Sequence, residues 1–224
     1  LPLLDRRQLF EHAIVSSDRP RMPFERATHL VGEGDLSVTL ADLDHAVELF
    51  VHSGVVVFDK IPALDDTFLE QCLSEFVGSF ERVVLQLSSL NVDMNKNFCF
   101  NEVCRRQRCR YDMRGLHGES LCSPRLALGS APWTDFIRLV LGEEAVELWR
   151  GVVLSQYGSE AQHWHRDGEC LFDYPHLPPH CVTIFVPLVP TTFEMGRTSF
   201  YPGSHVVSRS HCYELAYNPH HRYE

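Results

Sequence analysis

The first regular pattern of hydrophobic and polar positions along the chain spans residues 40–52. Hydrophobic side chains there repeat every three or four positions, the period of an amphipathic helix: Leu40, Leu43, Val47 and Phe50. Thr39 has Asp42 three residues further on and is the expected N-cap. Gly54 suits the C′ position, so we expect the helix to end near His52.

Two further helices are expected from the same kind of pattern. Residues 64–80 place four side chains on one inward face: Phe68, Cys72, Phe76 and Val77. A third, shorter helix is expected from Pro132 to Leu141, with Gly142 as its stop signal. Residues 91–101 show neither the helical period nor the alternation of a strand, and are expected to form a loop.

Short hydrophobic runs predict strands, once near the start and then repeatedly after residue 145. The run at residues 55–58, Val-Val-Val-Phe, is expected to be a strand that is buried on both faces. Later strands are expected at residues 147–157, 162–166, 181–188 and 198–201, with glycine, serine and proline turns between them. Strands at this spacing predict a sandwich or barrel.

The order of these elements predicts one domain rather than two. A chain of 224 residues fits a single large domain. Residues 1–36 are expected to be irregular, and residues 37–224 to form a mainly β domain with N-terminal helices. Within it, residues 37–142 form a helical buttress and residues 145–205 supply the barrel strands.

Composition and charge narrow the function classes. The net charge of −10 argues against a nucleic-acid partner, which would need a basic face. We expect no transmembrane segment, because no hydrophobic run approaches the roughly 18 residues of a membrane span. Asp5, Arg6 and Arg7 interrupt the short hydrophobic start, so a cleavable signal peptide is not expected either. A start at Leu1 suggests a processed end or the edge of a fragment.

The cysteines add an expectation about the compartment. None of the eight forms a CxxC pair, and Cys99, Cys104 and Cys109 recur at a spacing that matches no common zinc or iron–sulfur motif. We therefore expect buried thiols in an intracellular, reducing compartment, with the organelle unspecified.

Positive charge is concentrated in one strip of this acidic chain, at Arg105, Arg106, Arg108, Arg110 and Arg114. Such a run is usually a solvated face or a set of ion-pair partners. The alternative is a strip that recognises a carboxylate or phosphate, which would permit an anionic substrate.

The strongest candidate chemistry lies at residues 162–168, Gln-His-Trp-His-Arg-Asp-Gly. On a strand, positions i and i+2 share a face, so His165 and Asp167 could bind one metal ion. With a second histidine they would complete the 2-His-1-carboxylate triad of non-heme iron oxygenases. A histidine two residues from an acid is weak evidence alone, since His117 and Glu119 have the same spacing by chance.

Residues 162–168, followed by Leu171 and Phe172, resemble the first iron-ligand motif of phytanoyl-CoA dioxygenase-like proteins. The strand through Thr183, the Gly196-x-Thr198 step and the run 200–205, Phe-Tyr-Pro-Gly-Ser-His, fit the same pattern. The resemblance spans roughly residues 40–210. It implies a double-stranded β-helix, that is, a jelly roll or cupin-like barrel, and a dioxygenase that uses Fe(II), 2-oxoglutarate and O2 to hydroxylate a small or lipid-like molecule.

The resemblance also implies roles for single residues. His165 and Asp167 would be metal ligands, and an aspartate at this position favours hydroxylation over halogenation. Thr183 and Gln162 would contact 2-oxoglutarate. His205 is expected to belong to a structural turn and not to be the distal iron ligand.

The distal histidine of that family, and the arginine that follows it, have no match in residues 206–224. We therefore expect either a longer natural protein or a partner chain that completes the barrel. A catalytically inactive jelly-roll module, acting as a structural or interaction subunit of a larger assembly, is the alternative function. A third reading is a cupin-type barrel that binds another metal.

Overall fold

The structure is a computed structural model that describes residues 36–100, 102–114, 116–162, 165, 167, 180–200, 202–203 and 205. The predicted irregular segment falls almost wholly outside these residues, as do Leu171 and Phe172. The described elements are, in order, β1 (Ser37–Val38), α3 (Leu43–Ser53), β2 (Val57–Phe58), α4 (Asp66–Ser89), β3 (Phe98–Cys99), β4 (Val103–Gln107), β5 (Arg110–Met113), α5 (Thr134–Leu141) and β6 (Val152–Ser155). Two 3-10 turns, Pro124–Leu126 and Phe193–Met195, complete the list.

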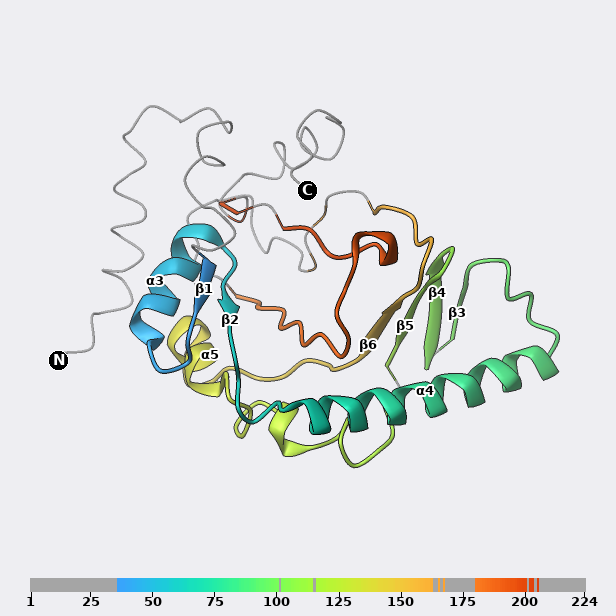
Figure 1. Cartoon of the computed structure of the whole chain (residues 1–224), viewed down its shortest axis with the longest axis horizontal. Helices are drawn as coiled ribbons and strands as arrows, with labels where there is room; N and C mark the ends of the chain where they lie inside the picture. Colours follow the sequence, from blue (N-terminus) through green and yellow to red (C-terminus); the bar gives the residue numbers. More distant parts are fainter. Residues whose placement is uncertain are drawn as a thin grey trace.

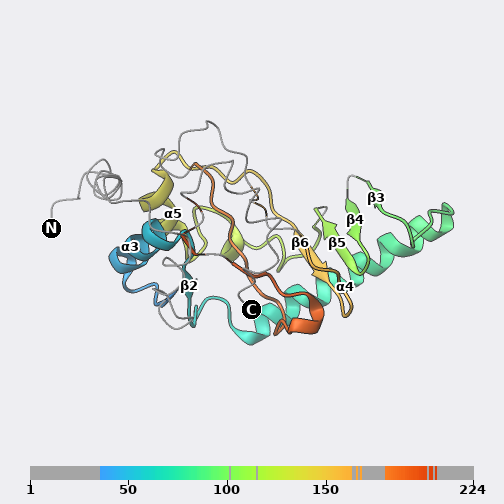
Figure 2. The same ribbon diagram turned by 90° about the horizontal axis from the view of Figure 1, so that it is seen from above.

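These elements form two groups, which Figures 1 and 2 show from perpendicular directions. At one end, α3 and α5 lie beside the small parallel pair β1–β2. At the other, the antiparallel sheet β3-β4-β5-β6 stands along the long helix α4. The segment 181–200 runs from the first group to the second and contacts the hydrophobic clusters of both.

The N-cap of helix α3 lies three residues after the predicted one, and the C-terminal end of the helix is as predicted. The side chain of Asp42, and not that of Thr39, caps the helix by accepting the N–H of His45 at 3.3 Å. An acidic side chain at this position also complements the positive end of the helix dipole. Gly54 terminates the helix in a left-handed conformation, φ +76°, and donates its N–H to Phe50 at 2.7 Å.

Helix α4 is longer than the sequence pattern predicts. Asp65 caps its N-terminus by accepting the N–H of Phe68 at 2.9 Å, and the helix continues to Ser89. Past Phe80 the hydrophobic stripe continues at helical spacing through Val83 to Leu87, so the prediction ends the helix too early. Helix α5 agrees closely with its prediction, with Gly142 at its C-cap.

The sheet packs one face against α4. Tyr111 and Met113, two positions apart on β5, both face the helix. The Tyr111 ring contacts the Phe80 ring edge to face, with the centroids 5.1 Å apart. Met113 is buried among Phe68, Cys72 and Phe76. Burial of such side chains, each worth about 1.5–3 kcal/mol, is what holds the sheet on the helix.

The second core lies between α3, α5 and the β1–β2 pair. The ring of Phe136 makes edge-to-face contacts with Phe50 and Phe58, with centroids 5.5 and 5.1 Å apart. Ala46 and Val140 fill the space between the helices. In the described part of the chain, no helix is long and hydrophobic enough to cross a membrane.

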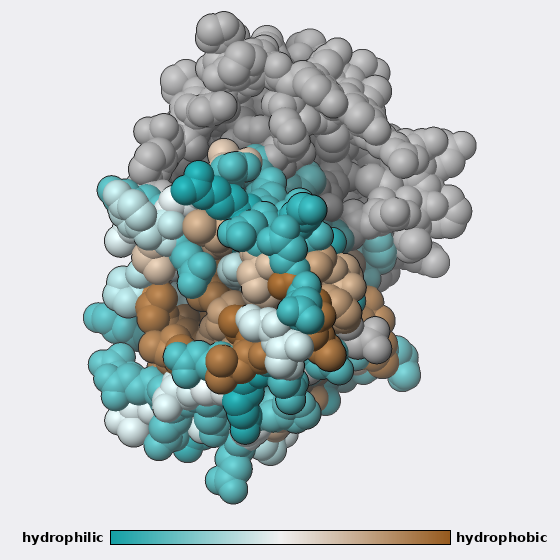
Figure 3. Space-filling model, turned by 90° about the vertical axis from the view of Figure 1, so that its right-hand side faces the viewer, coloured by the Kyte–Doolittle hydropathy of each residue, from teal (hydrophilic) through white to brown (hydrophobic). Residues whose placement is uncertain are grey.

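Hydrophobic side chains also remain exposed where α4 extends past the β3 edge of the sheet. Leu85, Leu90 and Phe100 are the large hydrophobic residues exposed near this end. Figure 3 looks onto the same end of the molecule and shows hydrophobic side chains gathered around a hollow. The last turns of α4 therefore leave Leu85 exposed although Leu87 is buried.

Several strand predictions are wrong within the described residues. Only residues 57–58 of the first predicted strand are β-structure, and Val57 is exposed rather than buried on both faces. The predicted strand 147–157 shortens to Val152–Ser155, because the preceding residues 145–151 run extended without a neighbour in a sheet. Residues 181–188 and 198–200, and also Gln162 and His165, are not in strands.

The predicted loop at residues 91–101 contains the short strand β3. Helices and an antiparallel sheet are thus shown, and the strands described do not close into a barrel.

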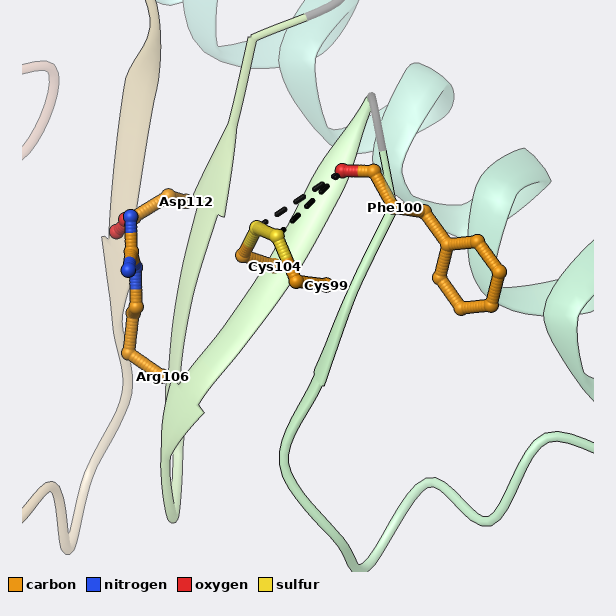
Figure 4. The surroundings of a disulfide bond; sticks show 5 residues. All are labelled: Cys99, Phe100, Cys104, Arg106 and Asp112. Atoms are coloured by element: carbon orange, nitrogen blue, oxygen red, sulfur yellow. Dashed lines mark hydrogen bonds and ion pairs between the residues drawn. A yellow bond between two sulfur atoms is a disulfide. The ribbon is translucent and has the colours of Figure 1, made fainter.

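The expectation that the cysteines are buried thiols is also wrong in part. Cys99 and Cys104 are directly opposite each other on β3 and β4, with Cα atoms 4.1 Å apart, and form a disulfide (Figure 4). Cys122 and Cys181 are exposed, whereas Cys72 is a buried free thiol. Burial, and secondly the nearby carboxylate of Glu75, raises the pKa of the Cys72 thiol.

Candidate metal-binding pair and its surroundings

His165 and Asp167 lie close together, as the sequence predicts. The Nε2 atom of His165 is 3.6 Å from Oδ1 of Asp167, and both side chains are about half exposed, at 53% and 51%. The two side chains therefore converge although neither residue is in a strand. Their exposure leaves both side chains accessible from solvent.

The donor atoms suit a first-row divalent metal. Imidazole nitrogen and carboxylate oxygen are the two donor types of the iron facial triad. At 3.6 Å, the imidazole nitrogen and the carboxylate oxygen are close enough that a small closing movement would let both hold one metal ion. Among the residues that the structure describes, no third histidine, cysteine or acid joins them to make a group of three.

The other two predicted site residues are accessible as well. Gln162 lies three residues before His165, and Thr183 lies in the extended segment that bridges the two groups of elements. The side chains of both are exposed. Their contacts with 2-oxoglutarate stay a prediction.

His205 packs against the C-terminal end of α3. Its Nε2 lies 2.9 Å from the carbonyl oxygen of Val51, and the N–H of Gly203 donates to Ser53 at 2.5 Å. A side chain at Gly54 would collide with the His205 ring. These contacts place Gly203 and His205 against the end of α3, and the structural role expected for His205 stays a prediction.

The arginine strip is divided among different environments. Arg106 pairs with Asp112 at 2.7 Å on the neighbouring strand (Figure 4), and Arg114 lies over the Trp149 ring at 4.9 Å. Arg105 and Arg110 are buried, and Arg108 is exposed in the turn between β4 and β5.

Arg110 fastens the turn that follows residue 192 to the end of the sheet. Its Nη2 atom donates to the carbonyl oxygens of Glu160 and Gly196, at 3.4 Å each. Burial lowers the pKa of Arg110, and the carboxylate of Asp112 opposes that change. The Ser155 hydroxyl donates to Met195 at 2.5 Å beside it. These bonds form one set of contacts that sequence spacing did not reveal, because they join residues up to 86 positions apart.

Comparison with known proteins agrees with the resemblance seen in the sequence. The family model for phytanoyl-CoA dioxygenase (PhyH) matches residues 123–223. The matched range includes His165, Asp167, Thr183 and the run 200–205. It does not include residues 40–122, for which the sequence also predicts similarity to this family. No solved structure matches the chain. Over residues 123–223, a little less than half of its length, the chain is similar to the phytanoyl-CoA dioxygenase family.

Proposed function

We propose that the protein is a non-heme Fe(II)- and 2-oxoglutarate-dependent dioxygenase that hydroxylates a small-molecule or lipid-like substrate. One observation carries the proposal: His165 and Asp167 converge to 3.6 Å inside the range that matches the family. The family is broad and its fold does not specify a substrate, so the acyl-CoA of the family name is not carried over.

In this proposal His165 and Asp167 act as ligands and not as acid or base groups. His165 supplies a neutral imidazole nitrogen, and Asp167 supplies a carboxylate that offsets part of the metal's positive charge. When bound, Fe(II) with 2-oxoglutarate and O2 supplies the oxidising chemistry of the reaction. Gln162 and Thr183 would orient the 2-oxoglutarate by hydrogen bonds from their side chains.

The third protein ligand must come from outside the described residues. Two ligands hold iron weakly and leave its geometry undefined, so a further histidine is needed for turnover. We propose that this histidine completes the site once the jelly roll of the family is assembled, either by residues outside the described part or by a partner chain.

The proposal is tested by the iron content and the 2-oxoglutarate-dependent succinate release of purified protein. We expect His165→Ala to lose bound Fe(II) and succinate release, because the change removes a metal ligand. His117→Ala is the matched control, since His117 is also exposed and also lies two residues before an acid. It should leave both measurements unchanged.

An equal iron content in wild type and His165→Ala would contradict the proposal. Bound iron without 2-oxoglutarate turnover would instead favour a barrel that uses a metal for other chemistry. Absence of iron in the wild-type protein as well would favour the inactive jelly-roll module of a larger assembly.

A further inference from the structure

A polar pocket lies at the end of the sheet where the turn between β4 and β5 approaches two other loops. Its volume is about 490 Å³, and its walls come from three separate segments of the chain. The α4–β3 loop contributes Asn95 and Asn97, the β4 end contributes Arg105, Gln107 and Arg108, and the turn after β6 contributes Glu160.

The pocket concentrates positive charge that no ion pair among the described residues neutralises. Two guanidinium groups and one carboxylate line it, so its walls carry one net positive charge in a chain whose net charge is −10. In the part of the chain that the structure describes, Arg108 makes no ion pair or hydrogen bond. The neighbouring Arg106 differs, because Asp112 already neutralises it.

Two buried polar atoms of the pocket walls lack partners among the described residues. Arg105 is only 9% exposed; its Nη1 donates to the carbonyl oxygen of Asn95 at 2.6 Å, but its Nε has no acceptor. The Oε1 atom of Gln107 has no donor. A buried polar atom without a partner typically costs about 1–3 kcal/mol, so each of these atoms calls for a partner such as a water, an ion or a ligand.

From this arrangement we infer that the pocket is a binding site for an oxyanion, the phosphate or carboxylate group of a small polar molecule. Guanidinium groups bind such groups through paired N–H donors, and the Asn95 and Asn97 amides add neutral donors at the rim. Gln107 and Glu160 offer acceptors for hydroxyl or amino groups on the remainder of the ligand. The site does not depend on the iron chemistry proposed above.

The test is calorimetric titration of the purified, metal-free protein with inorganic phosphate and, separately, with acetate, at constant ionic strength. We expect saturable binding of at least one anion, and the tighter one identifies which group the natural ligand carries. Arg108→Gln should weaken that binding by about tenfold, because it removes an exposed guanidinium from the pocket wall with little effect on packing.

Arg106→Gln is the matched control. It removes the same charge two residues away, from a side chain that is paired with Asp112 and does not line the pocket. The affinity of the Arg106→Gln variant for the anion should stay within about twofold of that of the wild type. Equal weakening by both variants would overturn the inference in favour of a diffuse charge effect, and so would the absence of saturable binding. Because metal is absent from these titrations, neither outcome depends on whether the dioxygenase proposal is correct.

Discussion

Glu75 joins the middle of α4 to the loop that leads toward α5. Its carboxylate accepts the N–H groups of Ser120 at 3.0 Å and Leu121 at 2.9 Å. Partial burial by itself would raise the pKa of Glu75, but these hydrogen bonds, from Leu121 and then Ser120, together outweigh it and lower the pKa. The folded protein therefore favours the ionised side chain.

We predict that Glu75→Gln lowers the free energy of unfolding by about 1–2 kcal/mol at neutral pH, because charge-assisted bonds become neutral ones. The folded pKa lies below the unfolded one, so the stabilisation is complete well above a pH of about 4.3 and disappears as pH falls through the lowered folded pKa. Urea unfolding at several pH values measures this.

Glu81→Gln is the control for that measurement, since Glu81 is exposed on the same helix. It should change stability little at any pH. A difference between wild type and Glu75→Gln that persists unchanged in acid would show that the contact acts by packing and not by charge.

Among single residues, the sequence predicts those that belong to a local motif. The sequence motif singles out His165 and Asp167, and the structure places Nε2 and Oδ1 3.6 Å apart, although not on the strand from which their shared face was predicted. The contacts of Glu75 with Ser120 and of Arg105 with Asn95 have no local signal, because folding alone brings these segments together. The pocket beside Arg105 could not be predicted for the same reason.

Among the elements, the end of α3 depends on Gly54 for two separate reasons. Its φ of +76° is in the left-handed region, and a side chain there would collide with the His205 ring. Gly203 has a similar φ of +79° but nothing within 4 Å of the position that a side chain would occupy. The two glycines therefore separate the backbone cost from the steric cost.

We predict that Gly203→Ala lowers the free energy of unfolding by about 1–2 kcal/mol, the strain of a left-handed alanine, and that Gly54→Ala lowers it by more. The additional loss of stability in Gly54→Ala, relative to Gly203→Ala, should be smaller when His205→Ala is also present, because the colliding ring is then absent. Thermal and urea unfolding measure all three. Equal costs for the two glycines would contradict the contact between the helix end and His205.

Helices are predicted better than strands for a physical reason. The stripe and caps of α3 and α5 are local, so Phe50, Gly54 and Gly142 mark them within one chain segment. A strand requires a neighbour that can lie far away in sequence, as in the pairing of Tyr111 with Leu154. Residues 181–188 are as hydrophobic as a buried strand, yet they run extended between the two cores.

At the scale of the whole molecule, the cores and the metal-binding pair are separate. The two hydrophobic clusters are built on α4 with its sheet and on α3 with α5. Neither includes His165 or Asp167, which are exposed. Loss of the pair should therefore affect chemistry and leave folding largely intact.

Asp167→Gly tests that separation directly. We predict that it abolishes iron binding and 2-oxoglutarate-dependent succinate release, while stability changes by less than about 1 kcal/mol, since a half-exposed ligand outside both cores is removed. Asp167→Asn keeps the size of the side chain without its charge and should lose iron to a similar degree. Unfolding curves and metal analysis on the same samples separate the two effects. If both variants lost their cooperative unfolding transition, Asp167 would be a structural residue, and the exposed pair would have to be reassigned to the architecture of the domain.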